Sequence, residues 1–80
     1  MEILLFGIAR DIVGNSSFRI PEDDGLPSSV LELKARLRNS FPEFGTLSSL
    51  AVAVNSNYAE DGDRLNKGDE IAIIPPVSGG

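Results

Sequence analysis

Hydrophobic residues along this chain fall in short runs separated by turn-forming residues, a pattern that predicts several strands. Residues 2–8 form an almost continuous apolar run of strand length. The turn-prone segment 14–16 separates this run from a second β-type run that ends with residues 18–20. Pro21 ends the second run because proline has no amide hydrogen to donate to a ladder. We therefore predict two paired strands, followed by a solvated turn over residues 22–25.

One segment has apolar residues at helical spacing and a capping signal at its start. Ser29 and Glu32 have the spacing of a capping box, so the helix should start near Val30. Pro42 should end it. The residues that recur on one face at helical spacing, and that we expect to pack on a sheet, are Val30, Leu33, Leu37 and Phe41.

The second half of the chain again has the pattern of strands and turns. Residues 50–54 predict a strand, residues 55–57 a turn and residues 58–59 a short return strand, which together make a hairpin. Residues 60–63 are acidic but lack the spaced oxygen ligands of a calcium loop, so we predict a turn and no metal site. Residues 70–74 form a last strand that we expect to be buried on both faces, which is typical of a central strand.

This order of elements predicts an α+β fold, with a mixed sheet of four to five strands and one main helix on one face. If the first and last strands pair in parallel at the centre, the fold is a ubiquitin-like β-grasp. Periodicity leaves a split βαβ arrangement open as the alternative. Eighty residues suffice for one core only. We predict a single domain over residues 1–76 and a flexible tail over residues 77–80.

Composition narrows the class of function. The chain has no cysteine and no histidine, which excludes disulfides, thiolate nucleophiles, the usual zinc sites and imidazole bases. No apolar run approaches the roughly 18 residues that a membrane helix needs, and the first residues resemble a strand rather than an export signal. We therefore expect a soluble cytoplasmic protein that is not an enzyme on its own.

Charge indicates the kind of partner. The net charge is −5, and residues 41–80 hold six acidic against two basic residues. This balance disfavours nucleic acid and anionic membranes as partners. It favours a protein with a basic surface, because complementary charge speeds encounter.

The last residues have an unusual composition. Pro75 and Pro76 stop strand pairing and favour a stiff, extended exit from the sheet. Gly79 and Gly80 give the end little bulk and wide backbone freedom. Such an end suits a narrow channel in another protein, although two terminal glycines alone are equally compatible with a frayed end.

Positions along nearly the whole chain match one known family, and the ending is the most specific part of the match. These positions are Phe6, Ala9 to Gly14, Val54-Asn55, Tyr58-Ala59, Leu65, Gly68-Asp69-Glu70 and Ile74-Pro75-Pro76-Val77-Ser78-Gly79-Gly80. In these residues the chain resembles the small, sulfur-carrying subunit of molybdopterin synthase, whose fold is a β-grasp.

The resemblance implies a carrier cycle at the terminal carboxylate of Gly80. An ATP-using adenylyltransferase of the ubiquitin-activating type would adenylate this carboxylate, and a sulfur donor would convert it to a thiocarboxylate. The tail, kept slim by Gly79, would then enter the large catalytic subunit of molybdopterin synthase and give its sulfur to a cyclic pyranopterin. The small chain would bind no cofactor tightly and would supply no catalytic group.

Two other functions fit the same features. A sulfur carrier of another pathway, such as thiamine synthesis, shares the fold and a Gly-Gly end. A ubiquitin-like modifier, joined to target lysines through the same activated terminus, is the alternative from a different class.

The docking surface follows from strand alternation. Leu4, Phe6 and Ile8 should point to the face opposite Ile3 and Leu5. A single helix covers one face of a small sheet, so apolar residues on the other face are exposed unless the segment 41–47 folds under them. We predict that the partner-binding residues are Phe6, Ile74, Pro75, Pro76, Val77 and Ser78.

Overall fold

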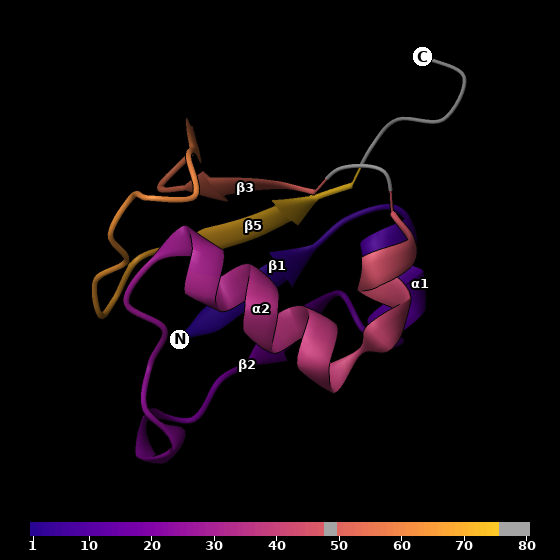
Figure 1. Cartoon of the computed structure of the whole chain (residues 1–80), viewed down its shortest axis with the longest axis horizontal. Coiled ribbons are helices and arrows are strands. Elements are labelled where there is room, and N and C mark those ends of the chain that lie inside the picture. Colours follow the sequence, from indigo (N-terminus) through magenta and orange to yellow (C-terminus); the bar gives the residue numbers. More distant parts are fainter. Residues whose placement is uncertain (48–49, 76–80) are drawn as a thin grey trace.

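The computed structural model describes residues 1–47 and 50–75 as one mixed sheet with helices packed on it (Figure 1). Within these residues the strands are β1 Glu2–Leu5, β2 Ser17–Arg19, β3 Ala51–Val54, β4 Asn57–Ala59 and β5 Ile71–Ile74. The α-helices in the same ranges are α1 Ile8–Val13 and α2 Val30–Ser40, and the 3-10 helices are η1 Glu22–Asp24 and η2 Pro42–Thr46.

The sheet has the order β2-β1-β5-β3-β4, with β5 at its centre. β1 and β5 are parallel neighbours, and each of the other pairs is antiparallel. Because the first and last strands pair directly, the prediction of a β-grasp is confirmed and the split βαβ alternative is wrong.

Helix α2 starts where the sequence predicts. Ser29 is the N-cap, and its Oγ accepts a hydrogen bond of 3.2 Å from the Glu32 amide. The Glu32 carboxylate reaches back one residue further than in a standard capping box, accepting bonds of 2.8 and 3.3 Å from the Ser28 hydroxyl and amide. The bond to Ser29 satisfies one of the amides that the first helical turn leaves free, and the bonds to Ser28 fix the residue before the cap.

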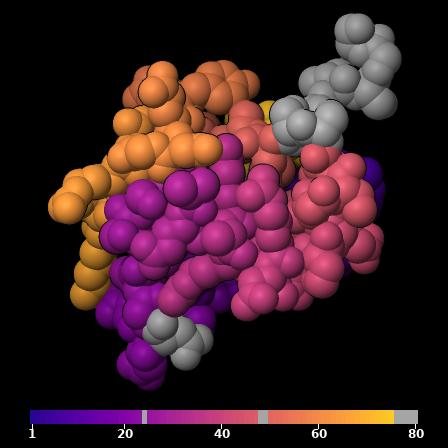
Figure 2. All heavy atoms as spheres, viewed as in Figure 1, coloured from indigo at the N-terminus to yellow at the C-terminus, as the bar shows by residue number. Residues whose placement is uncertain are grey.

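The core lies between α2 and the face of the sheet that it covers. Val30, Leu33 and Leu37 are fully buried against Ile71 and Ile73 and their neighbours in the same cluster. In Figure 2 the atoms of α2 and η2 cover this side of the molecule. Phe41, expected on the same helix face, is only half-buried, because it caps the helix and packs edge-on against neighbouring rings instead.

Two segments differ from the sequence prediction. β1 ends at Leu5 rather than at Ile8, because Gly7 turns the chain with φ 55° and the short helix α1 begins at Ile8. After Pro42 the chain continues as η2 and buries Phe44, which is 1% exposed. The single main helix of the prediction is therefore α2, accompanied by one short helix that the apolar run concealed.

The hairpin between β3 and β4 is confirmed. Asn55 and Ser56 have φ values of 51° and 71°, as a two-residue turn with both central residues left-handed requires. The Asn55 side chain also fastens this turn to the start of β5. Its Nδ2 donates to Asp69 Oδ1 at 3.1 Å and its Oδ1 accepts from the Glu70 amide at 2.9 Å.

The acidic segment before β5 forms a turn, as the sequence predicts. The Glu60 amide donates to Asp63 Oδ2 and the Asp63 amide donates to the Glu60 carbonyl, both at 2.9 Å. Over the described residues no helix is long and apolar enough to cross a membrane. The same residues contain no cluster of three or more acidic side chains placed to hold a metal ion.

The Glu32 cap predicts a specific dependence of stability on pH. The Ser28 hydroxyl and then the Ser28 amide hold the pKa of the Glu32 carboxyl below its ordinary value, and Arg36 adds to this. A carboxylate whose pKa is lower in the folded state stabilises the fold above its unfolded pKa, and this contribution is lost as the pH falls through the folded pKa.

We therefore expect Glu32→Gln to be less stable than the wild type at neutral pH and equally stable in acid, as measured by urea unfolding across the acid range. Glu43→Gln, at an exposed position in η2, is the control and should change the dependence of stability on pH less. A Glu32→Gln deficit that is constant with pH would contradict the assignment.

Candidate functional site

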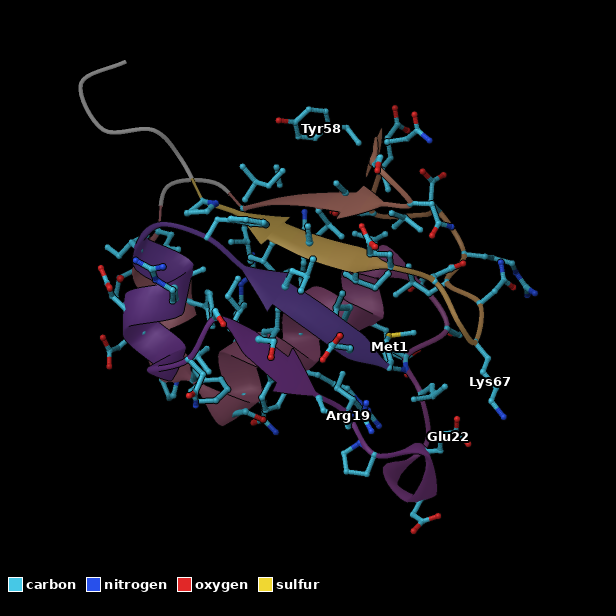
Figure 3. All side chains as sticks on the ribbon, turned by 180° about the vertical axis from the view of Figure 1, so that it is seen from behind. Met1, Arg19, Glu22, Tyr58 and Lys67 are labelled. Atoms are coloured by element: carbon cyan, nitrogen blue, oxygen red, sulfur yellow. The ribbon has the colours of Figure 1, made fainter. Side chains whose placement is uncertain are left out.

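The sheet has a second face, opposite α2, and Figure 3 shows it without a helix across it in the part of the chain that is drawn in full. The strand register sets four side chains in one row across this face. Leu4 pairs with Ala72, Ala72 with Ala53, and Ala53 with Tyr58. Three of the four are small or aliphatic, and Tyr58 at the edge is 75% exposed. We call these four residues the far-face row.

The alternation along β5 corrects one prediction. The sequence suggested a strand buried on both faces, but only Ile71 and Ile73 are buried. Ala72 and Ile74 point away from α2 and are partly exposed. The helix can cover one face only, so the second set of apolar side chains of this central strand remains accessible.

A second group of apolar residues lies where the two central strands end. Ile74 pairs with Ala51 on the far face, and Phe6 follows β1 by one residue and is 51% exposed. Leu5 and Ile73 are register partners, so Phe6 and Ile74 come next in the same register. We call Phe6 and Ile74 the exit patch.

The segment 41–47 does not bury this patch. Its Phe44 packs in the core instead, on the α2 side, while Phe6 stays exposed. The alternative that this segment folds under Phe6 is therefore wrong. Ile8, which the sequence analysis placed on the far face of a strand, belongs to α1 and is 47% exposed there.

The exit patch adjoins the point where the chain leaves the sheet. Pro75 follows β5 directly and is half-buried. An ideal Cβ placed on Gly7 would lie only 3.3 Å from Pro75 Cγ, so the two residues are in close approach. The other predicted tail residues, Pro76, Val77, Ser78, Gly79 and Gly80, lie outside the described residues.

Sequence reasoning gave Gly7 no role. The signal that could have found it is a glycine inside a run that otherwise looks like a strand, which often marks a bend or a close approach of backbone.

A hollow of about 690 Å³ lies at the opposite end of the same face. Glu2 and Glu70, at the starts of β1 and β5, line it, whereas the tail departs from the far ends of these strands. Lys67 Nζ lies 3.4 Å from Glu22 Oε2 across its rim, and both side chains are largely exposed (Figure 3). An open, charged hollow of this kind does not shield a reaction from water, so we do not assign chemistry to it.

The described side chains form no catalytic constellation. Among the described residues, no buried side-chain nitrogen or oxygen lacks a hydrogen-bond partner. The sequence has neither histidine nor cysteine to act as base or nucleophile. What the site offers is an accessible apolar surface beside the departure of the tail. Such an arrangement is suited to docking on a partner.

Comparison with known proteins gives the family. The model of the ThiS family matches residues 3–80. A molybdopterin synthase sulfur carrier subunit from Dictyostelium discoideum is 40% identical over 84 residues, covering 99% of this chain and 94% of the relative. The human molybdopterin synthase sulfur carrier subunit is 31% identical over 86 residues, covering 100% of this chain and 93% of the relative.

Solved structures agree with the fold. The crystal structure of SAMP1 from Haloferax volcanii matches with a TM-score of 0.77 and 25% identity, over 99% of this chain and 97% of that chain. A chain in the complex of subunits 1 and 2 of molybdopterin-converting factor from Helicobacter pylori matches with a TM-score of 0.64 and 28% identity. The match covers 99% of this chain and 96% of that chain. This chain therefore belongs to the ThiS family and, within it, to the sulfur carrier subunits of molybdopterin synthase.

Proposed function

We propose that this chain carries sulfur for molybdopterin synthesis as a thiocarboxylate on Gly80. The observation that carries the proposal is the match to sulfur carrier subunits over nearly their whole length, with the family model reaching residue 80. The geometry supports it, because Pro75 leaves the sheet beside an exposed apolar patch that a partner can cover.

The chemistry explains why the chain needs an activating partner. A carboxylate is a poor electrophile, so an oxygen of the Gly80 carboxylate first attacks the α-phosphorus of ATP and releases pyrophosphate. A sulfur donor then attacks the acyl carbon of the adenylate and releases AMP, which leaves a thiocarboxylate. We assign adenylation to an enzyme of the ubiquitin-activating type, and the small chain holds no cofactor tightly. Its use of ATP and of a second enzyme suits the cytoplasm.

The large subunit of molybdopterin synthase is the proposed acceptor. There the thiocarboxylate sulfur attacks a carbon of a cyclic pyranopterin and displaces an oxygen substituent from it. Water then cleaves the acyl–sulfur bond, which leaves the sulfur on the pterin and returns the Gly80 carboxylate. The catalytic bases and the residues that bind the substrate belong to the large subunit, consistent with the lack of a catalytic constellation among the described residues of this chain. The Helicobacter pylori neighbour, whose structure contains both subunits, supports this pairing.

A second candidate function is conjugation to target lysines. The Haloferax volcanii neighbour favours it, since SAMP1 is a small archaeal modifier protein. The same acyl-adenylate would then react with a lysine amine in place of a sulfur donor. Isopeptide-linked Gly-Gly remnants on cellular lysines would favour this role, whereas a thiocarboxylate detected by intact mass favours the carrier.

Removal of Gly80 should abolish sulfur transfer without unfolding the protein. The reacting carboxylate would be displaced, whereas the buried core lies within residues 3–73. The measurement is molybdopterin formation with the large subunit, together with the intact mass after incubation with the activating enzyme, ATP and sulfide. An added residue after Gly80 is a second variant with the same expected loss. Normal sulfur transfer by either variant would refute the mechanism.

Loss of the exit patch should weaken docking more than folding. Phe6 is 51% exposed, so Phe6→Ala should leave the free energy of unfolding nearly unchanged and weaken binding to the large subunit by about 1–3 kcal/mol. Ile74→Asp should act in the same direction. Binding is measured by titration calorimetry and stability by urea unfolding.

Phe44→Ala is the matched control. Removing this buried ring should lower the free energy of unfolding by about 3–5 kcal/mol and leave the exit patch unchanged. If the Phe6 and Ile74 variants unfold readily while their folded fraction binds normally, the two residues are part of the core and the interface lies elsewhere.

A further inference from the structure

The two central strands end side by side, and the chain then leaves them in two directions. β1 and β5 run parallel with Leu5 opposite Ile73, so continuing the register brings Gly7 opposite Pro75. After Gly7 the chain turns into α1, and after Pro75 it continues towards the tail. Close approach at this point therefore links the turn out of β1 to the exit from β5.

The backbone at Gly7 has a conformation that side chains disfavour. Its φ of 55° and ψ of −134° are those of the first central residue of a type II′ turn, where glycine is strongly preferred. The Ala9 amide closes the turn with a 3.1 Å hydrogen bond to the Phe6 carbonyl. The Arg10 amide then donates to the Gly7 carbonyl at 3.1 Å and begins α1. A residue with a Cβ would be strained here even in open space.

The space at Gly7 is tighter than at the other described glycines with positive φ. Its ideal Cβ would lie 3.3 Å from Pro75 Cγ, tighter than ordinary van der Waals contact. Gly14 and Gly68 also have positive φ, at 89° and 90°, but a Cβ on either would meet no atom within 4 Å. Gly7 therefore satisfies two requirements at once, a turn and a close contact with Pro75, the residue that follows β5.

We propose that Gly7 is a positioning residue for sulfur transfer: the absence of its side chain lets Pro75 lie against the turn and sets the direction in which the tail leaves the sheet. This inference rests on the proposed function, since it concerns the delivery of Gly80. The exit patch lies directly beside this contact, so a partner that binds Phe6 and Ile74 receives the tail at a defined offset.

The proposal separates docking from delivery. A Cβ at residue 7 requires Pro75 to shift by a few tenths of an ångström, which turns the chain that follows Pro75 while most of the docking surface is unchanged. The reacting carboxylate then reaches the partner's active site less often in a productive geometry, and small misplacements of reacting groups lower rates steeply. A change in turnover with little change in apparent affinity is the signature of such a residue.

The first experiment measures docking and delivery separately, as the KM for the carrier and the kcat of the activating enzyme. The assay is ATP–pyrophosphate exchange that depends on the carrier. We expect Gly7→Ala to lower kcat by about three- to tenfold and to change the KM for the carrier by less than about twofold. Gly14→Ala and Gly68→Ala are matched controls, because they place the same side chain at positive φ in open space. Both should retain wild-type kcat and KM.

A rescue variant tests the contact itself. Pro75→Ala removes the ring atom that a Cβ at residue 7 would meet, so Gly7→Ala should lower kcat less in the Pro75→Ala background than in the wild type. Equal losses in both backgrounds would refute the role of the contact. The proposal would also be overturned if all three glycine variants lost kcat in proportion to their loss of thermal stability, because Gly7 would then have only a folding role.

A second experiment needs no partner and no sulfur chemistry, so its outcome is independent of the proposed function. The chain has no cysteine, and Ser78→Cys therefore accepts a single nitroxide label on the tail. Paramagnetic broadening of backbone amides then maps where the tail lies. We expect Gly7→Ala to shift the set of broadened amides and Gly14→Ala to leave it unchanged. An identical broadening pattern in the wild type and Gly7→Ala would overturn the proposal even if the carrier function holds.

Discussion

The parallel pairing of β1 with β5 is the contact on which the rest of this structure depends. It joins the first and last strands at the centre of the sheet, with Ile3 opposite Ile71 and Leu5 opposite Ile73. All four side chains are buried in the core under α2, so the residues that pair the two strands are also core residues. Because the two strands are parallel, their carboxyl ends coincide, and Phe6 and Pro75 are brought to the same edge of the sheet.

One helix across a small sheet leaves the opposite face accessible, and this chain has apolar side chains on that face. The far-face row and the exit patch would be a liability on a protein with no partner, because accessible apolar surface favours association. On a carrier the same surface is useful. Under the proposed function it would let the activating enzyme and the large subunit recognise the folded domain while the reacting group stays outside the core.

The proposed division between domain and tail would also account for the composition of the chain. Catalytic side chains require burial, charged neighbours and precise support, which an 80-residue domain can supply only at a cost to its core. Locating the chemistry at a terminal carboxylate avoids that conflict. The domain then needs stability, a recognition surface and a defined exit, and features such as the Asn55 bonds to Asp69 and Glu70 hold the loops around β5 in place.

Much of the fold is determined by local signals in the sequence. The cap formed by Ser29 and Glu32, the stop at Pro42 and the left-handed turn at Asn55 each depend on hydrogen bonds or sterics within a few residues, so their patterns can be interpreted without tertiary information. The same reasoning predicted the strands and, through the resemblance of the tail, the family. It missed α1, because an apolar run of strand length hides the turn at Gly7.

Only the tertiary structure decided which apolar residues are buried and which residue lies beside Pro75 at the end of β5. Ile71 and Ile74 have the same side chain in the same strand, yet one is buried beneath α2 and the other remains partly exposed, because the helix packs on a single face. The contact of Gly7 with Pro75 joins residues from opposite ends of the chain. Periodicity records which side chains share a face, but the pairing of distant strands determines which residues become neighbours, and that pairing depends on the packing of the whole core.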